Sequence, residues 1–289
     1  AKCTCFPFFF CKFSTIWLLQ VRFLQSALLC KETDFMSFDT IYREGVQRIW
    51  EEDAESQRGF LDAIASARNM KSIDFKAINA FFVPNGAYIL KYFDDTITFS
   101  EYGFYEGDYC FWNNCLLMPI YDVADKVVSV AGFNPFRYLE SKEKDDRSIN
   151  YYIYAPSQVF KKGSFMFYLE GCYKKALDDQ YIIITDGVFD TIALQLAGFN
   201  AGALMSSSVT QEIATLLRFI KHVLIASDND EAGLKLVEKI RAVHPFVTVI
   251  RQKRTKDIDD LLKSEYRDKA ISELKMAINS VSFSYSLNV

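Results

Sequence analysis

The sequence predicts an α/β fold, in which a mixed α+β amino-terminal lobe is followed by a lobe with a parallel central sheet. Two short apolar runs, Tyr181–Thr185 and His222–Ser227, each end at an acidic residue and lead into a helical pattern. Val247–Ile250 is a third short apolar run, which is followed by basic residues. Short runs rich in β-branched residues that feed helices are typical of buried parallel strands.

Upstream of these strands, apolar residues recur at helical spacing in three stretches. They are Asp39–Trp50, Gly59–Ala67 and Ser72–Phe82. Ser72 is expected to cap the third helix. Apolar runs at residues 115–121 and 127–133 predict a pair of strands, and alternation over Thr96–Phe99 predicts another.

The remaining segments complete four predicted parts of the chain. Glu140–Asp146 is expected to be a charge-rich loop, Asp268–Asn279 a closing helix and Ser280–Val289 a frayed tail. The predicted parts are an atypical apolar segment at residues 1–35, the amino-terminal lobe at 36–175, the parallel-sheet lobe at 176–270, and the closing helix with its tail at 271–289.

Acidic side chains follow two of the predicted strands. Asp186 follows the first, and Asp228 and Asp230 follow the second. The carboxyl ends of parallel strands meet at one edge of a sheet, so these carboxylates are expected to converge. A divalent cation such as Mg²⁺ or Mn²⁺ relieves the resulting repulsion. Helix capping is the alternative, but it leaves a second acid, Asp190 or Asp230, unexplained at each site.

Four cations follow the third strand. They are Arg251, Lys253, Arg254 and Lys256. If that strand is parallel to the others, these cations lie at the same edge as the acids, which favours phosphate contact over a solvated loop. The net charge of -4 gives no general basic signature of a nucleic-acid-binding protein, so phosphate contact has to be local.

The apolar segment and the cysteines exclude several classes of protein. In residues 1–35, Gln20, Arg22 and Gln25 interrupt the apolar run that a signal peptide or membrane span requires. This segment is expected to form an atypical helix that packs on the main body or on a neighbour. The seven cysteines lack the paired spacing of a structural zinc site, and their odd number indicates reduced thiols in a cytosol.

Four segments carry a characteristic pattern of acids and glycines. They are Ile184–Asp190, Ala197–Phe199, Asp228–Gly233 and Lys256–Leu261. Together they resemble the TOPRIM domain that topoisomerases share with bacterial- and phage-type DNA primases. The upstream segments resemble the amino-terminal lobe of the primases, so that the likeness runs from residue 36 to residue 270. Those segments are Phe75–Pro84, Leu117–Asp122 with Val127–Phe133, and the basic turn Phe160–Gly163.

The resemblance implies a Rossmann-like TOPRIM lobe and metal-dependent synthesis of short RNA primers on a single-stranded DNA template. It implies that Asp186, Asp228 and Asp230 are catalytic and hold Mg²⁺ or Mn²⁺. Asp257 and Asp259 are secondary metal candidates, although Asp259 is equally suited to cap a helix. The family has Glu where this chain has Asp186, which shortens the reach of that carboxylate by one methylene.

The resemblance also implies partners and a set of phosphate-binding cations. Lys161 and Lys162, in the basic turn, are expected to contact triphosphate or template. Arg137 and Arg147 lie near positions where the family has cations that this chain lacks. The implied partners are single-stranded DNA, ribonucleoside triphosphates and a replicative helicase, in the cytoplasm of a bacterial or phage-infected cell. The zinc-binding module that the family usually carries is not reproduced here, so it is either absent or supplied separately.

Two other functions use the same residues. A TOPRIM nuclease would hydrolyse DNA with these acids, but the primase-like upstream lobe argues against it. A degenerate lobe would bind DNA or a replication partner without catalysis, but the density of acids argues for catalysis. A topoisomerase would need a tyrosine domain for which the chain has no room. Tyr151, Tyr152 and Tyr154 are the only aromatic group expected to stack on bases.

Overall fold

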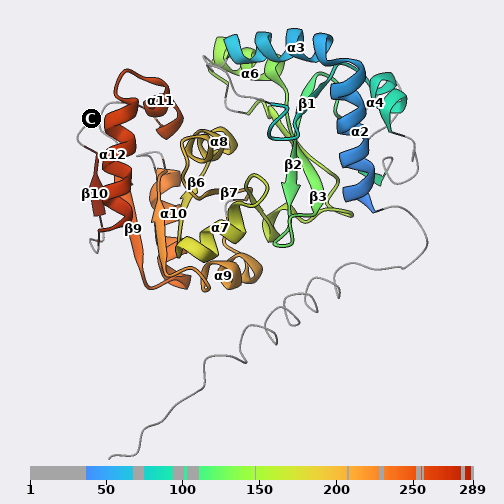
Figure 1. The fold of residues 1–289 in the computed structure, drawn as a ribbon. Helices are drawn as coiled ribbons and strands as arrows, with labels where there is room; N and C mark the ends of the chain where they lie inside the picture. The colour runs from blue at the N-terminus through green and yellow to red at the C-terminus, as the bar shows by residue number, and fades with distance from the viewer. Residues whose placement is uncertain are drawn as a thin grey trace, which may run out of the picture. The chain divides into compact units, whose positions relative to one another are not determined.

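Two β-sheets organise the part of the chain that the computed structural model describes (Figure 1). The described residues are 37–67, 75–93, 101–102, 111–146, 148–206, 208–227, 231–251, 255, 257–280 and 284–287. The first sheet is four-stranded, in the order β1-β2-β3-β4, and the second is six-stranded, in the order β10-β9-β8-β6-β7-β5. The predicted α/β class with a parallel central sheet is confirmed.

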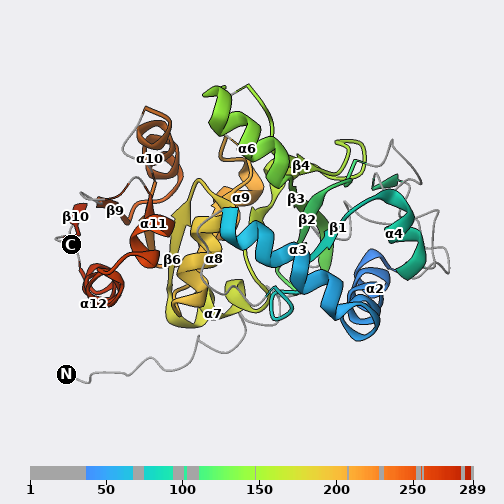
Figure 2. The same ribbon diagram turned by 90° about the horizontal axis from the view of Figure 1, so that it is seen from above.

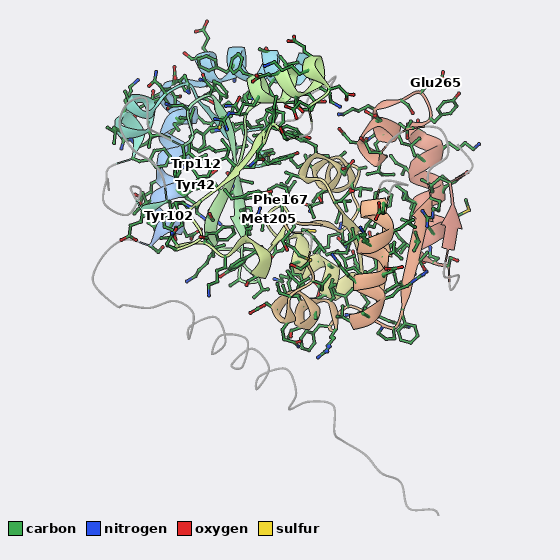
Figure 3. The ribbon with its side chains drawn as sticks, turned by 180° about the vertical axis from the view of Figure 1, so that it is seen from behind. Tyr42, Tyr102, Trp112, Phe167, Met205 and Glu265 are labelled. Carbon is green, nitrogen blue, oxygen red and sulfur yellow. The ribbon has the colours of Figure 1, made fainter. Side chains whose placement is uncertain are left out.

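The first sheet is antiparallel and has long helices beside it. Its strands are β1 (Phe81–Val83), β2 (Cys115–Tyr121), β3 (Val127–Phe133) and β4 (Tyr152–Tyr154). The accompanying helices are α2 (Phe38–Glu52), α3 (Ala54–Ala67), α4 (Gly86–Tyr92) and α6 (Pro135–Lys144). Every residue of β2 is buried, which explains why its sequence is a continuous apolar run. The core here is aromatic: Tyr42 and Trp112, both fully buried, are labelled in Figure 3.

A buried glutamine completes the hydrogen bonding of β1 at the edge of this sheet. The amide N of Phe82 donates to Oε1 of Gln57 (2.7 Å), and Nε2 of Gln57 donates to the carbonyl O of Phe82 (2.9 Å). Gln57 lies in α3 and is fully buried. One side chain thus satisfies both backbone groups of Phe82 that face away from the neighbouring strand.

The second sheet is parallel except at one edge. Its strands are β5 (Met166–Phe167), β6 (Tyr181–Thr185), β7 (Ala201–Leu204), β8 (His222–Ile225), β9 (Val247–Arg251) and β10 (Ser284–Ser286). Only the pairing of β5 with β7 is antiparallel. The associated helices are η1 (Lys162–Ser164, 3₁₀), α7 (Cys172–Asp179), α8 (Val188–Leu196), α9 (Gln211–Leu217), α10 (Glu231–Val243), α11 (Ile258–Lys263) and α12 (Arg267–Ile278).

Helices cover both faces of the second sheet. Figure 2 shows α8, α11 and α12 on one side, and α9 and α10 on the other. Side chains of β6 alternate accordingly: Ile183 packs in a cluster with residues of α11 and α12, whereas Ile182 and Ile184 join the larger core, which includes residues of α9 and α10. Burial on both faces is what the unbroken apolar strands predict.

Charged and aromatic contacts join the two sheets. The guanidinium of Arg43 (α2) pairs with Asp39 (2.8 Å) and with Glu170 (2.9 Å), which precedes α7, and donates to the carbonyl O of Asp125 (2.7 Å) in the β2–β3 turn. Asp125 accepts in turn from the amide N of Gly171 (2.7 Å). Residues of α2, of the hairpin turn and of the segment before α7 are therefore held together.

A second connection, which we call the aromatic seam, consists of Phe133, Tyr152 and Phe189. The ring centroids of Phe133 (β3) and Phe189 (α8) lie 5.0 Å apart in an edge-to-face arrangement. Tyr152 (β4) lies 5.7 Å from Phe133 and 6.4 Å from Phe189. Aromatic contacts in this distance range are favourable beyond their buried area.

Two predicted elements in the first half are wrong. Ser72–Phe82 is expected to be a helix, but its described residues form a turn followed by the start of β1. The reason is that β1 pairs with β2 and the Phe82 backbone bonds to Gln57. Glu140–Asp146 is mostly the end of α6 and not a loop. Asn134 caps α6 by accepting from the amide N of Arg137 (3.0 Å). The predicted strand Thr96–Phe99 lies outside the described residues.

The carboxyl-terminal segment is also more ordered than predicted. Residues 284–286 of the expected tail form β10, which pairs parallel with β9. Leu287 is fully buried, and its amide N donates to the carbonyl O of Arg251 (2.8 Å). The predicted closing helix is present as α12.

The predicted division of the chain into four parts stays a prediction. β5 precedes the expected boundary at residue 175, yet it belongs to the second sheet. The apolar segment at residues 1–35 lies outside the described residues. Within the described part of the chain, no helix is long and apolar enough to cross a membrane.

Candidate functional site

The register of the parallel strands brings three strand ends to one edge of the second sheet. Ile184 of β6 pairs with Ile225 of β8, and Ile225 pairs with Val249 of β9. The residues two positions beyond these partners therefore lie at the same edge. They are Asp186, Ser227 and Arg251. Asp186 is exposed and Arg251 is half-buried.

Several predicted site residues lie outside the described residues. They are Asp228, Asp230, Arg147, Lys253, Arg254 and Lys256. In the sequence, Asp228 directly follows Ser227. The expected convergence of Asp186 with Asp228 and Asp230 stays a prediction.

Buried hydroxyl groups shape the turn that follows β6. The Oγ1 of Thr185 donates to the carbonyl O of Gly187 (2.9 Å) and lies 2.7 Å from Oγ1 of Thr191, and both threonines are fully buried. Between them the chain leaves the sheet at Asp186 and enters α8 at Val188. The turn thereby leaves the carboxylate of Asp186 at the surface of the strand edge.

Asp190, in the first turn of α8, lies among the other acids. Its Oδ1 accepts a hydrogen bond from the amide N of Asp259 (3.0 Å). Burial raises the pKa of the Asp190 carboxyl well above its ordinary value, and the charges of Asp257, Asp186 and Asp259 raise it further. The hydrogen bond from Asp259 acts in the opposite direction. Three other carboxylates are therefore close enough to Asp190 to affect its ionisation.

The two acids of the closing motif have separate partners in the structure. Asp257 is the N-cap of α11, and its Oδ1 accepts from the amide N of Asp260 (2.8 Å). Asp259 is buried and forms an ion pair with Lys263 one turn later. The predicted cap at Asp259 is thus supplied by Asp257. Among the described residues, no group of three or more His, Cys, Asp or Glu side chains is arranged to hold a metal ion.

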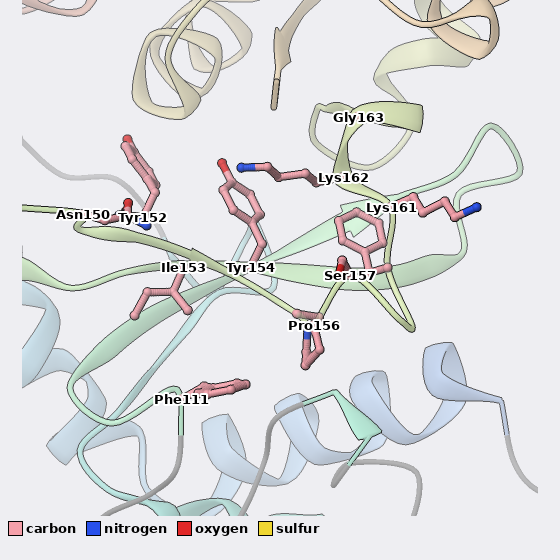
Figure 4. A pocket seen from close by; sticks show the side chains of 12 residues that line it. Phe111, Asn150, Tyr152, Ile153, Tyr154, Pro156, Ser157, Lys161, Lys162 and Gly163 are labelled. Carbon is pink, nitrogen blue, oxygen red and sulfur yellow. Dashed lines mark hydrogen bonds between the residues drawn. The ribbon is translucent and has the colours of Figure 1, made fainter. Parts of the chain in front are cut away.

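A groove of about 620 Å³ lies beside β4 and the basic turn. Figure 4 shows Tyr152 and Tyr154 on one side of β4 and Ile153, with Phe111, on the other. The Nζ of Lys162 lies 4.8 Å from the ring centroid of Tyr154, in the range of a cation–π contact. Burial raises the pKa of the Tyr154 hydroxyl to about 12, so it remains protonated.

The basic turn is anchored to the second sheet. Thr210, the N-cap of α9, donates through Oγ1 to the carbonyl O of Gly163 (3.1 Å). Lys161 and Lys162 are exposed on this turn and line the groove. Arg137 is exposed in the first turn of α6.

The predicted stacking group divides between two environments. Tyr152 and Tyr154 line the groove. Tyr151 packs edge-to-face on Tyr138 (5.3 Å) and on Phe133 (6.1 Å), and it does not line the groove. A role in base stacking stays a prediction.

Asp190 is noted in the sequence as a second acid after the first strand, but it is not among the predicted catalytic or metal-binding residues. The available signal was its position four residues after Asp186, just inside the following helix, but the pattern did not reveal its contact with Asp259. That contact joins residues 69 positions apart.

Comparison with known proteins agrees with this architecture. Residues 183–262 match the family described as Toprim-like. The DNA primase of Thermotoga maritima is 32% identical over 143 residues, which is 47% of this chain and 25% of that protein. The DNA primase of Aquifex aeolicus is 33% identical over 126 residues, 43% of this chain and 24% of that protein. The chain thus spans about a quarter of the length of these curated relatives.

Solved structures extend the similarity beyond the second sheet. The zinc-binding and RNA polymerase domains of the Aquifex aeolicus primase match with a TM-score of 0.64 and 22% identity, over 91% of this chain and 66% of that chain. The RNA polymerase domain of the Mycobacterium tuberculosis primase DnaG matches with a TM-score of 0.60 and 20% identity, over 82% of this chain and 83% of that one. The chain is therefore similar to bacterial DNA primases over nearly half of its own length, matches the Toprim-like family in its second half, and shares the fold of the RNA polymerase domain of these primases.

Proposed function

We propose that this chain is the catalytic core of a DNA primase, a nucleotidyltransferase that makes short RNA primers on single-stranded DNA. The observation that carries the proposal is the edge of the second sheet, where the exposed carboxylate of Asp186 lies beside the end of β8 and the half-buried Asp190 joins the start of α8 to α11. Similarity to proteins named DNA primase supports the reaction class.

The residues at this edge fit Mg²⁺ or Mn²⁺. Carboxylate oxygens are the preferred ligands of these ions. Burial and then the charges of neighbouring acids raise the pKa of Asp190, and a divalent cation would relieve the repulsion between those charges. Asp186, Asp228 and Asp230 would hold the ions, with Asp257 and Asp259 as secondary candidates. A cation bound there would supply stabilisation of the negative charge that develops during phosphoryl transfer.

Cations of the chain would bind the phosphates of the substrates. Lys161 and Lys162 lie along the groove, where they would contact the triphosphate or the template backbone. Arg251 is the last residue of β9, at the same edge as Asp186, and Lys253, Arg254 and Lys256 follow it in the sequence. Arg137 and Arg147 would extend the basic surface.

The neighbouring aromatic rings and the partner proteins complete the proposal. Tyr152 and Tyr154 offer apolar faces to unpaired bases in the groove. A replicative helicase and a separately supplied zinc-binding module would act with the chain.

Primer synthesis on single-stranded DNA tests the proposal directly. The chain is incubated with template, labelled ribonucleotides and Mg²⁺ or Mn²⁺, alongside the Asp186→Ala and Asp228→Ala variants. Short RNA products that disappear in both variants are expected. Asp268→Ala is the matched control, because the Asp268 side chain is 98% exposed on α12 and lies outside the acidic motifs.

Other results would replace the proposal. Cation-dependent cleavage of the template without primer synthesis would assign a nuclease that uses the same acids. DNA binding without either activity would assign a non-catalytic lobe. Primer synthesis that survives both substitutions would show that the reacting groups lie elsewhere.

A further inference from the structure

Helix α11 begins with backbone amides that need partners from outside the helix. It spans only six residues, Ile258–Lys263, and the first N–H groups of any helix have no acceptor within it. Asp257 supplies an acceptor for the amide N of Asp260 (2.8 Å). The acceptor for the amide N of Asp259 is Oδ1 of Asp190 (3.0 Å), which lies 69 positions earlier in the chain. A short helix of this kind depends on tertiary contacts for its position.

The other oxygen of Asp190 lies against the turn that carries Asp186. A Cβ atom added at Gly187 would lie 2.2 Å from Oδ2 of Asp190, closer than any van der Waals contact. Only glycine therefore leaves room for the carboxylate in this place. Asp190 touches the turn after β6 through one oxygen and α11 through the other.

We propose that Asp190 is a positioning residue, whose carboxylate fixes α11, with Asp257 and Asp259, relative to the turn that carries Asp186. The inference rests on the proposed function, because it takes these acids as the cation-binding set. It differs from direct ligation of a cation by Asp190. A positioning role needs a hydrogen-bond acceptor at Oδ1, whereas ligation needs the negative charge.

Binding of Mn²⁺ to the full chain, measured by calorimetry without DNA or nucleotide, distinguishes the two roles. Asp190→Ala removes the acceptor and is expected to weaken binding about 10- to 100-fold, as loss of a group that orients metal ligands typically does. Asp190→Asn keeps an oxygen acceptor without the charge and is expected to bind Mn²⁺ as the parent does. Asp260→Ala is the matched control, since it removes an exposed acid from the same helix.

Gly187→Ala provides a second route to the same perturbation. Its Cβ displaces the Asp190 carboxylate without removing it, so this variant is expected to resemble Asp190→Ala. Hydrogen exchange of the backbone amides gives a readout that is independent of cations. The amide of Asp259 should exchange faster in Asp190→Ala and in Gly187→Ala, and at the parental rate in Asp190→Asn.

Three results would overturn the inference. Asp190→Asn that binds Mn²⁺ as weakly as Asp190→Ala would assign ligation by the charge. Asp190→Ala that binds Mn²⁺ like the parent would remove the positioning role. Unchanged exchange of the Asp259 amide in Asp190→Ala would exclude the contact itself. A parent chain that neither binds Mn²⁺ nor makes primers would refute the proposed function, and the exchange rates would still decide the contact.

Discussion

Replacement of Gln57 by leucine tests whether one buried amide holds the edge of the first sheet. Gln57→Leu leaves the N–H and the C=O of Phe82 without their present partners, at a position where Gln57 is fully buried. An unsatisfied buried polar group costs about 1–3 kcal/mol, so the two groups together cost about 2–6 kcal/mol. That loss is a large fraction of the roughly 5–15 kcal/mol by which folded proteins are stable.

Urea unfolding followed by circular dichroism measures this loss as a lower midpoint at an unchanged slope. Gln47→Leu is the control, because the Gln47 amide donates to Glu51 (2.8 Å) at an exposed site on α2. This substitution should change the free energy of unfolding by less than about 0.5 kcal/mol. Equal midpoints for Gln57→Leu and Gln47→Leu would refute the reasoning.

Gln57→Glu separates the acceptor from the donor. The carboxylate still accepts from the amide N of Phe82, but when ionised it cannot donate to the carbonyl O. This variant should regain stability relative to the parent as the pH falls and the carboxyl becomes protonated. A constant difference between the two chains across pH would show that the donated hydrogen bond contributes nothing.

Three further predictions concern titration and DNA binding. Because burial and neighbouring acids raise the pKa of Asp190, the folded chain binds its proton more tightly than the unfolded chain does. Without metal, the parent should therefore lose stability relative to Asp190→Asn as the pH rises above about 4 and passes the raised pKa. Urea midpoints of the two chains that differ by the same amount at every pH would contradict this. Burial lowers the pKa of His222, so the parent should lose stability relative to His222→Gln as the pH falls below about 6.5. Urea midpoints that differ by a constant amount across pH would exclude this contribution of His222. Lys162→Ala should lower the slope of log affinity for single-stranded DNA against log salt concentration by about 0.7, measured by fluorescence anisotropy. Lys174→Ala on α7 is the control and should leave this slope unchanged. Equal slopes in the two variants would remove Lys162 from the phosphate contacts.

The buried strands could be predicted from the sequence because their signal is local. Tyr181–Thr185 and Val127–Phe133 are runs that only a strand packed on both sides accommodates, and both appear as β6 and β3. Glu140–Asp146 was misassigned because its charges suggested a loop. Those same residues are good helix formers, and Asn134 with Pro135 marks the start of α6.

Other features depend on contacts that no local pattern encodes. β1 exists because the Phe82 backbone lies between Leu116 and Gln57, which are distant in sequence. β10 pairs with β9 although its own sequence is short and polar. At the site, the position of Asp186 followed from the end of a strand, but the pairing of Asp190 with Asp259 followed only from the packing of α8 on α11.

The aromatic seam connects the groove to the acids through a continuous set of ring contacts. Tyr152 lines the groove, Phe133 packs against it, and Phe189, which touches both rings, directly precedes Asp190. A DNA strand in the groove that binds one conformation of the Tyr152 side chain more tightly than another therefore shifts the balance of conformations at the start of α8. Linkage is reciprocal, so if occupancy of the groove changes the affinity of the acids for a cation, the cation changes the affinity of the groove by the same factor.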